Sequence, residues 1–219
     1  MNEETPAGSS SVFNIPNQIT IARLVLSLVF FVLLGLLGHA QPDWLQTNRQ
    51  VFLNWSNVLL MLAIATDFFD GYLARRWNLE STFGRIADPF VDKITICGSF
   101  IMLTTISDLV EPWYPLVIVF REFLVSGLRS YLESAGVAFG AAWAGKVKMV
   151  IQSMTIPVLI FYEANFIADA HGEKMLEPLW PSMAEPVKWL TIALLAATLI
   201  STFYSCIVYL RKAVTALRS

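Results

Sequence analysis

Charge is scarce in this chain of 219 residues, because Lys, Arg, Asp and Glu make up 15% of it, against about 25% in ordinary soluble domains. A soluble domain of this length would need more charged surface. The apolar residues, 56% of the chain, come in runs of roughly twenty, enough to cross about 30 Å of hydrocarbon as helix. Barrel strands would be shorter and would alternate apolar with polar residues. We therefore expect an integral, multi-pass, all-α membrane protein with no nucleic-acid partner.

Cysteine is also rare, and Cys97 and Cys206 both fall inside apolar runs. This pattern suggests neither a disulfide framework nor a thiolate metal site, so both are interpreted as packing residues. The sequence shows no internal repeat and no second domain.

Six transmembrane helices are predicted, in one domain at 17–212 between a polar lead at 1–16 and a tail at 213–219. The first is expected to be retained, because acidic residues precede it and its apolar core is long for a signal peptide. The connector at 166–185 is interpreted as an interfacial loop. The predicted spans are Ile19–Leu37, Asn54–Arg76, Phe83–Ser107, Trp113–Ser134, Gly145–Asn165 and Pro186–Arg211.

The distribution of Lys and Arg predicts the orientation of these helices. The connectors on the other side of the membrane hold few cations and many acidic residues. By the positive-inside rule, the termini and the basic side face the cytoplasm of a bacterial-type inner membrane. The basic side carries Arg75, Arg76, Arg85, Arg129, Lys146, Lys148, Arg211, Lys212 and Arg218.

Four aspartates flank the connector between the second and third predicted spans. Asp67 and Asp70 are three residues apart, and Asp88 and Asp92 are four apart, so each pair shares a helical face. Carboxylates gathered near lipid repel one another unless cations cancel them. Oxygen ligands suit Mg²⁺, Mn²⁺ or Ca²⁺, and four acids can hold two such ions around a phosphoryl group. The alternative is that they form helix-end salt bridges with neighbouring Arg and Lys.

The residues between these aspartates would admit a phosphorylated ligand. Gly71, Ala74 and Gly84 have little or no side chain, so a ligand can approach the backbone there. Arg75 offers a fork-shaped donor for phosphate.

The full pattern, D-x2-D-G-x2-A-R-x8-G-x3-D-x3-D from Asp67 to Asp92, resembles the signature of the CDP-alcohol phosphotransferases. Residues 14–23, 121–129 and 145–148 resemble those family members that form phosphatidylglycerophosphate. The resemblance covers about residues 14–155. The C-terminal third matches only in having a final span.

The resemblance implies an enzyme that uses two divalent cations, Mg²⁺ or Mn²⁺, to transfer the phosphatidyl group from CDP-diacylglycerol to glycerol 3-phosphate, releasing CMP. It implies a homodimer in contact with membrane lipids. Asp67, Asp70, Asp88 and Asp92 would bind the metals, and Asp92 would also be the general base. The CDP group would be held by Asp70, Gly71, Ala74, Arg75 and Gly84.

The acceptor phosphate needs a cationic pocket, for which the candidates are Arg121, Arg129, Lys146 and Lys148. Lys146 and Lys148 cannot both point into one pocket if they lie on a helix. Lys148 could instead be a positive-inside anchor, and Arg121 could pair with Glu122 inside the bundle.

Three polar residues at the start of the first span could line the same site: Asn17, Thr20 and Arg23. Asn17 could equally be a helix cap, and Arg23 a cation that reaches back to the membrane surface.

Other acceptors stay open: inositol phosphate, serine, or phosphatidylglycerol in cardiolipin synthesis. A divalent-cation transporter is a rival from another class. However, transporter sites tend to lie near the midplane between broken helices, whereas these acids cluster at one membrane end beside Arg75 and Arg85. A catalytically inactive scaffold is disfavoured because all four aspartates are present.

Overall fold

The computed structural model describes residues 15–38, 43–77, 82–136, 140, 142–167 and 181–218. At 15, 16, 43, 46, 67–77, 82–86, 181 and 218 it describes the helix but not the side chains. The predicted all-α fold is confirmed in these residues. A short helix, α2 (Asp43–Thr47), and a 3₁₀ turn, η1 (Pro181–Met183), accompany six long helices. The long helices are α1 (Ile15–Leu37), α3 (Arg49–Trp77), α4 (Thr82–Leu103), α5 (Trp113–Ser134), α6 (Trp143–Asn165) and α7 (Ala184–Arg218).

Three helices are long and apolar enough to cross a membrane, judged by length and composition over the described residues. They are Asn17–Leu37, Trp143–Asn165 and Ala184–Leu217, with mean hydropathies of 2.5, 1.3 and 1.9. α5 also has the length, at 22 residues, but holds Arg121, Glu122, Arg129 and Glu133. A membrane protein is therefore supported.

Several helix ends differ from the prediction. α4 ends at Leu103 rather than Ser107, because the chain tightens there: the Thr105 and Ile106 amides donate to carbonyls three residues back. α7 continues through most of the predicted tail, since Ala213 is buried against the cluster around Tyr209. The lead at 1–14 and most of the connector at 166–185 lie outside the described residues.

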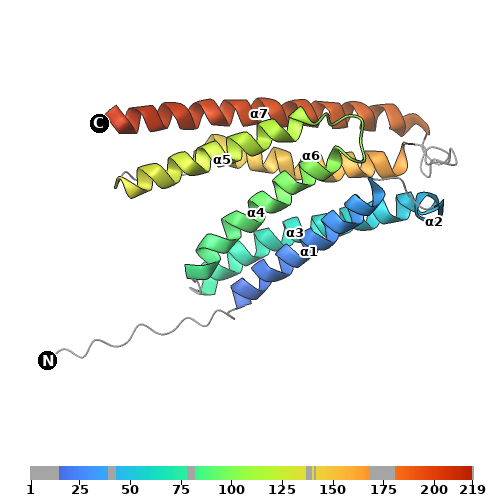
Figure 1. The fold of residues 1–219 in the computed structure, drawn as a ribbon, viewed down its shortest axis with the longest axis horizontal. Coiled ribbons are helices and arrows are strands. Elements are labelled where there is room, and N and C mark those ends of the chain that lie inside the picture. The colour runs from blue at the N-terminus through green and yellow to red at the C-terminus, as the bar shows by residue number, and fades with distance from the viewer. Residues whose placement is uncertain are drawn as a thin grey trace.

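The long helices form one bundle. α1 packs against α3 and α4, α6 packs against α3 and α7, and α5 packs against α7. The core between them is apolar and includes Phe30, Leu60, Phe100 and Ile156. The start of α1, the end of α3, the start of α4 and the end of α7 all lie at one end of the bundle, on the left of Figure 1.

Arg49 ties three segments together at the opposite end. Its guanidinium donates to the Glu163 carbonyl of α6 at 3.4 Å and to the Ile106 carbonyl beyond α4 at 3.1 Å. Carbonyls at a helix C-terminus have no partner within the helix, so an arginine from α3 satisfies them across the bundle. Asn54 and Asn165 exchange hydrogen bonds of 3.3 and 3.1 Å beside it.

α1 and α4 approach closely where Gly98 faces Phe31. A Cβ atom at Gly98 would lie 2.4 Å from the Phe31 ring, whereas a Cβ at Gly127 of α5 would meet nothing within 4 Å. Ser27 and Thr95 share a hydrogen bond of 2.7 Å across the same interface. This contact holds α1 against the helix that carries Asp88 and Asp92.

We predict that Gly98→Ala destabilises the protein by about 1–3 kcal/mol, because the added methyl group must displace the Phe31 ring. Gly127→Ala is the matched control and should be neutral or stabilising, because alanine favours helix over glycine. Thermal unfolding in detergent measures both, and adding Phe31→Leu to Gly98→Ala should restore part of the loss. Equal melting temperatures for the two alanine variants would contradict the close packing.

Candidate active site

The aspartate motif lies where α3 ends and α4 begins. Asp67 and Asp70 fall in the last turns of α3, and Asp88 and Asp92 fall on α4 beyond the connector at 78–81. The helix is described at Asp67, Asp70, Gly71, Ala74, Arg75 and Gly84, but the side chains and surroundings of these residues are not. The structure therefore gives the geometry of Asp88 and Asp92 alone.

α1 brings a hydroxyl and a guanidinium to these two carboxylates. Thr20 Oγ1 donates to Asp88 Oδ1 at 2.5 Å. Arg23 places Nη2 at 3.8 Å from Asp88 Oδ1 and Nη1 at 3.9 Å from Asp92 Oδ1. With 1% of its surface exposed, Arg23 lies inside the bundle. It therefore offsets the negative charge of both acids.

The structure does not support the two alternative roles considered for residues of α1, namely Arg23 as a cation at the membrane surface and Asn17 as a helix cap. Arg23 does not reach back to the membrane surface, since it is enclosed beside Asp88 and Asp92. Asn17 is no helix cap, because α1 begins at Ile15 and Asn17 is buried within its first turn.

The described part of the motif suits a divalent cation. Asp88 and Asp92 lie four residues apart on α4 and are partly exposed, and their separations from Arg23 exceed a direct hydrogen bond. Their oxygens are the ligand type that Mg²⁺ and Mn²⁺ take. No group of three or more Asp, Glu, His or Cys side chains that could hold a metal occurs among the described ones.

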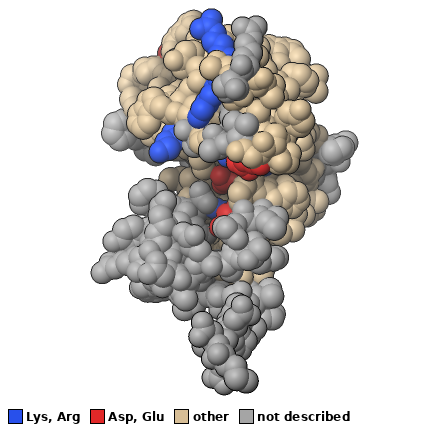
Figure 2. Space-filling view, turned by 90° about the vertical axis from the view of Figure 1, so that its left-hand side faces the viewer, with Lys and Arg blue, Asp and Glu red and all other residues tan. Residues whose placement is uncertain are grey.

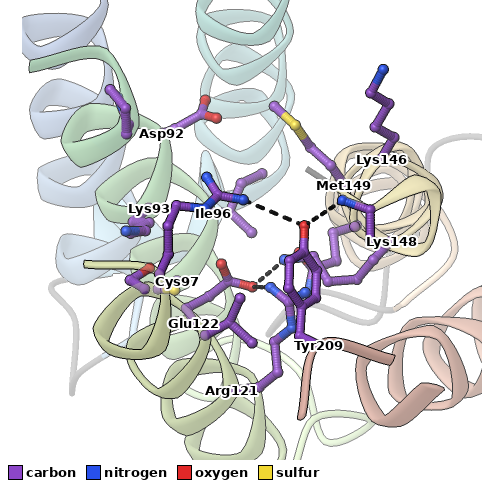
Figure 3. Close-up of a pocket in the computed structure, with 17 residues that line it drawn as sticks. Asp92, Lys93, Ile96, Cys97, Arg121, Glu122, Lys146, Lys148, Met149 and Tyr209 are labelled. Atoms are coloured by element: carbon purple, nitrogen blue, oxygen red, sulfur yellow. Dashed lines mark hydrogen bonds and ion pairs between the residues drawn. The ribbon is translucent and has the colours of Figure 1, made fainter. Parts of the chain in front are cut away.

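Asp92 also lines a cavity of about 260 Å³ that opens between α4, α5, α6 and α7. Figure 3 shows the Asp92 carboxylate on one side of this cavity, with Arg121, Glu122 and Tyr209 on another. Seen from the end of the bundle, basic side chains stand above a recess in which acidic atoms are visible (Figure 2). Charged residues lining the cavity are Asp92, Lys93, Arg121, Glu122, Arg129, Lys146 and Lys148.

Glu122 gathers two of these cations. Its Oε1 accepts a hydrogen bond of 2.8 Å from Arg121 Nη1 and a second from Lys148 Nζ. Lys148 is 5% exposed, so it is no surface anchor, whereas Lys146 is exposed and extends away from the cavity centre (Figure 3). Arg121 does pair with Glu122 inside the bundle, as the alternative interpretation predicted, but this contact uses only Nη1 of its guanidinium.

Two arginine donors remain available to a ligand. The Nε atoms of Arg121 and Arg129 are buried and have no hydrogen-bond partner among the described residues. An unpaired buried donor is costly, so both arginines keep hydrogen-bonding capacity that no described residue uses. Because the lining cations outnumber Asp92 and Glu122, the cavity suits an anionic group.

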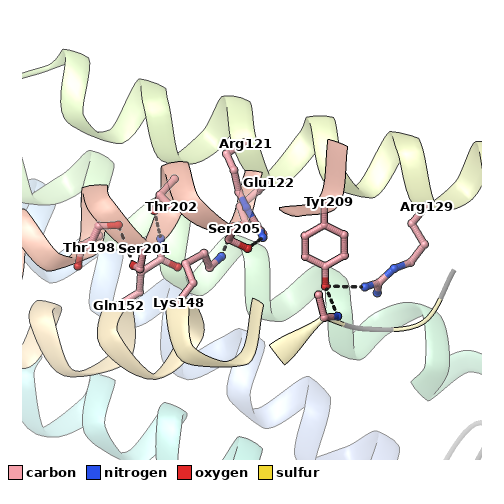
Figure 4. A network of polar contacts seen from close by, with 11 residues as sticks. Arg121, Glu122, Arg129, Lys148, Gln152, Thr198, Ser201, Thr202, Ser205 and Tyr209 are labelled. Carbon is pink, nitrogen blue, oxygen red and sulfur yellow. Dashed lines mark hydrogen bonds and ion pairs between the residues drawn. The ribbon is translucent and has the colours of Figure 1, made fainter. Parts of the chain in front are cut away.

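Sequence reasoning missed the contribution of α7. Ser205 accepts a hydrogen bond from Arg121 Nη2, and the Tyr209 hydroxyl accepts one of 3.4 Å from Arg129 (Figure 4). The available signal was a stripe of polar residues at helical spacing in an otherwise apolar span. The stripe consists of Thr191, Thr198, Thr202, Ser205 and Tyr209.

Comparison with known proteins gives the family. Residues 13–204 match the profile of the CDP-alcohol phosphatidyltransferases. The chain belongs to this family. The resemblance stated from the aspartate pattern is thereby confirmed, and the chain is a phosphatidyltransferase.

Similar family members share one name, CDP-diacylglycerol–glycerol-3-phosphate 3-phosphatidyltransferase. The Bacillus subtilis (strain 168) protein is 34% identical over 160 residues, which cover 71% of this chain and 80% of that protein. The Rickettsia felis protein is 36% identical over 151 residues, covering 67% and 75%. A third, from Salmonella paratyphi A, is 30% identical over 155 residues, covering 68% and 78%.

We predict that Lys148→Met destabilises the protein by about 1–3 kcal/mol, because Glu122 loses a charged donor inside the bundle. Lys146→Met is the control and should change stability little, since Lys146 is exposed. Thermal unfolding in detergent compares them. Combining Lys148→Met with Glu122→Gln should recover stability, and a double variant no better than Lys148→Met would contradict the pairing.

Proposed function

We propose that this phosphatidyltransferase moves the phosphatidyl group from CDP-diacylglycerol to glycerol 3-phosphate, giving phosphatidylglycerophosphate and CMP. The observation that carries the proposal is that Asp92 lines one cavity with Arg121 and Arg129, whose buried Nε donors await an acceptor. A hydroxyl can then lie near a base while the phosphate at the other end of the same small molecule meets cations. The names of the relatives support this pair of substrates.

Asp67, Asp70, Asp88 and Asp92 would hold two divalent cations, Mg²⁺ or Mn²⁺. When bound, these ions neutralise the charge that develops on the pyrophosphate of the donor. Arg23 and Thr20 would keep Asp88 and Asp92 in place, since both contact Asp88 from α1. Asn17, buried one turn before, would line the same site.

The donor would be held at the motif itself. Asp70, Gly71, Ala74, Arg75 and Gly84 would bind the CDP group, with the small residues allowing close approach and Arg75 donating to phosphate. These residues lie at the end of α3 and the start of α4, next to Asp88 and Asp92 in the sequence, which supports a donor site beside the two acids.

The acceptor would lie in the cavity. Arg121, Arg129 and Lys148 would face its phosphate, and Lys146 would attract it at the rim. Glu122 holds Arg121 and Lys148 together, so these two cations converge on one point.

Asp92 would take the proton from the acceptor hydroxyl as the hydroxyl oxygen attacks the phosphorus bonded to the lipid alcohol. The new oxygen–phosphorus bond replaces the bond to CMP, and CMP leaves with the electron pair. Positioning and electrostatics supply most of the rate enhancement in such a transfer, because the protein forms no covalent intermediate.

We propose a bacterial-type inner membrane location, with α1, α3, α4, α5, α6 and α7 as six spans and with the active site and both termini cytoplasmic. The three apolar helices and the basic side of the sequence support this arrangement. The single catalytic domain at 17–212 and the homodimer stay predictions.

Purified protein in mixed micelles should release CMP from CDP-diacylglycerol when glycerol 3-phosphate and Mg²⁺ or Mn²⁺ are present, and EDTA should abolish the release. Inositol phosphate, phosphatidylglycerol and serine serve as comparison acceptors, and serine should give at least about tenfold lower kcat/KM, because it has no phosphate for the cationic cavity to bind. Turnover with another acceptor and none with glycerol 3-phosphate would overturn the substrate while leaving the family intact.

Asp92→Asn should lower kcat by about 10²–10⁴-fold, because the amide cannot accept the hydroxyl proton. Binding of CDP-diacylglycerol should be largely retained. Steady-state CMP release and equilibrium binding of the donor measure the two effects separately. Undiminished turnover would exclude Asp92 as the base.

A further inference from the structure

Tyr209 of α7 contacts both arginines of the cavity, although it belongs to the part of the chain whose sequence suggested no function. The centroid of its ring lies 5.5 Å from the Arg121 guanidinium carbon, and its hydroxyl accepts the hydrogen bond from Arg129. We infer that Tyr209 is the positioning residue that makes Arg121 and Arg129 converge on the acceptor phosphate. The inference rests on the proposed function of the cavity.

Helix geometry explains why the arginines need help to converge. Arg121 and Arg129 are eight residues apart on α5, which separates their Cα atoms by about 12 Å. Two cations so far apart contact one phosphate only if their side chains bend toward each other. Tyr209 lies between them, with the ring toward Arg121 and the hydroxyl toward Arg129 (Figure 4).

Tyr209 holds the arginines without using the donors that a phosphate needs. The contact with Arg121 is to the face of an aromatic ring, and Ser205 takes one Nη of the same guanidinium. The contact with Arg129 uses Nη2. Both Nε atoms are left without a partner among the described residues, as a site ready for an anion requires.

The start of α6 is shaped around the Tyr209 hydroxyl. The Ala142 amide donates to this oxygen at 2.9 Å. A Cβ atom at Gly145 would lie 2.9 Å from the oxygen and 3.3 Å from ring atom Cε2, so a side chain there would push Tyr209 away. Gly145 therefore admits the hydroxyl between α5 and α6, and Lys212, one turn later on α7, donates to the Gly140 carbonyl at 2.8 Å.

We expect Tyr209→Phe to raise the KM for glycerol 3-phosphate about five- to tenfold, because Arg129 loses its acceptor. The KM for CDP-diacylglycerol and kcat should change less than about twofold, since Tyr209 contacts the two arginines and the Ala142 amide on the acceptor side of the cavity. Tyr209→Leu, which also removes the aromatic ring, should raise the acceptor KM further. Tyr204→Phe is the matched control, because Tyr204 lies on the same helix and is 62% exposed.

A double-variant test separates positioning from a general loss of packing. Gly145→Ala should raise the acceptor KM in the wild-type background and raise it less in the Tyr209→Phe background, where the oxygen that the new Cβ meets is absent. Equal effects in both backgrounds would contradict the role of the hydroxyl. The role of the hydroxyl would also be contradicted if Tyr209→Phe shifted the melting temperature, kcat and both KM values together. A residue that only stabilises the bundle would behave in that way.

Isothermal titration of glycerol 3-phosphate into the detergent-solubilised wild type distinguishes this inference from the proposed function. If the wild type neither binds nor turns over glycerol 3-phosphate, the proposed function fails and the inference fails with it. If the wild type does both and Tyr209→Phe binds glycerol 3-phosphate equally well, the inference alone is overturned. Weaker binding by Tyr209→Phe, with unchanged binding by Tyr204→Phe, supports it.

Discussion

Arg23 lies almost completely enclosed in the bundle, with its guanidinium near the carboxylates of both Asp88 and Asp92. Carboxylates at the end of a membrane bundle need nearby positive charge, because neither lipid nor the apolar core solvates them. α1 supplies that charge from a helix that is otherwise apolar. The close contact of Gly98 with Phe31 holds α1 where Arg23 can reach the acids.

In the cavity beside Asp92 the charges are reversed: one carboxylate lies between two cations. Arg121 and Lys148 are buried cations, and Glu122 is the carboxylate that pairs with both. Each cluster therefore has an internal counter-charge and leaves some groups available: carboxylate oxygens near α1 and two arginine Nε atoms near α7. Asp92 and the cations Arg121 and Arg129 thus line one cavity, and no ion pair between Asp92 and these arginines occurs among the described contacts. This arrangement suits a molecule that has a hydroxyl at one end and a phosphate at the other.

α7 links α5 to α6 beside the cavity. Its polar stripe meets α6 through Gln152 and Thr202 and meets the arginines of α5 through Ser205 and Tyr209. Intramembrane hydroxyls commonly join helices in this way, because lipid offers them no other partner. In this bundle they also determine where the arginines point.

The sequence by itself determined the class of protein, the six long helices, the family and the pairing of aspartates on each helix, because length, hydropathy and spacing along one helix are local properties. It identified Arg121, Arg129 and Lys148 as candidates but could not tell an anchoring lysine from a buried one. Only the tertiary structure decided that Arg23 lies beside Asp88, that Lys148 pairs with Glu122 and that Tyr209 lies between two arginines. Those contacts join residues 26 to 88 positions apart, and packing between helices, rather than any pattern along the chain, brings such residues together.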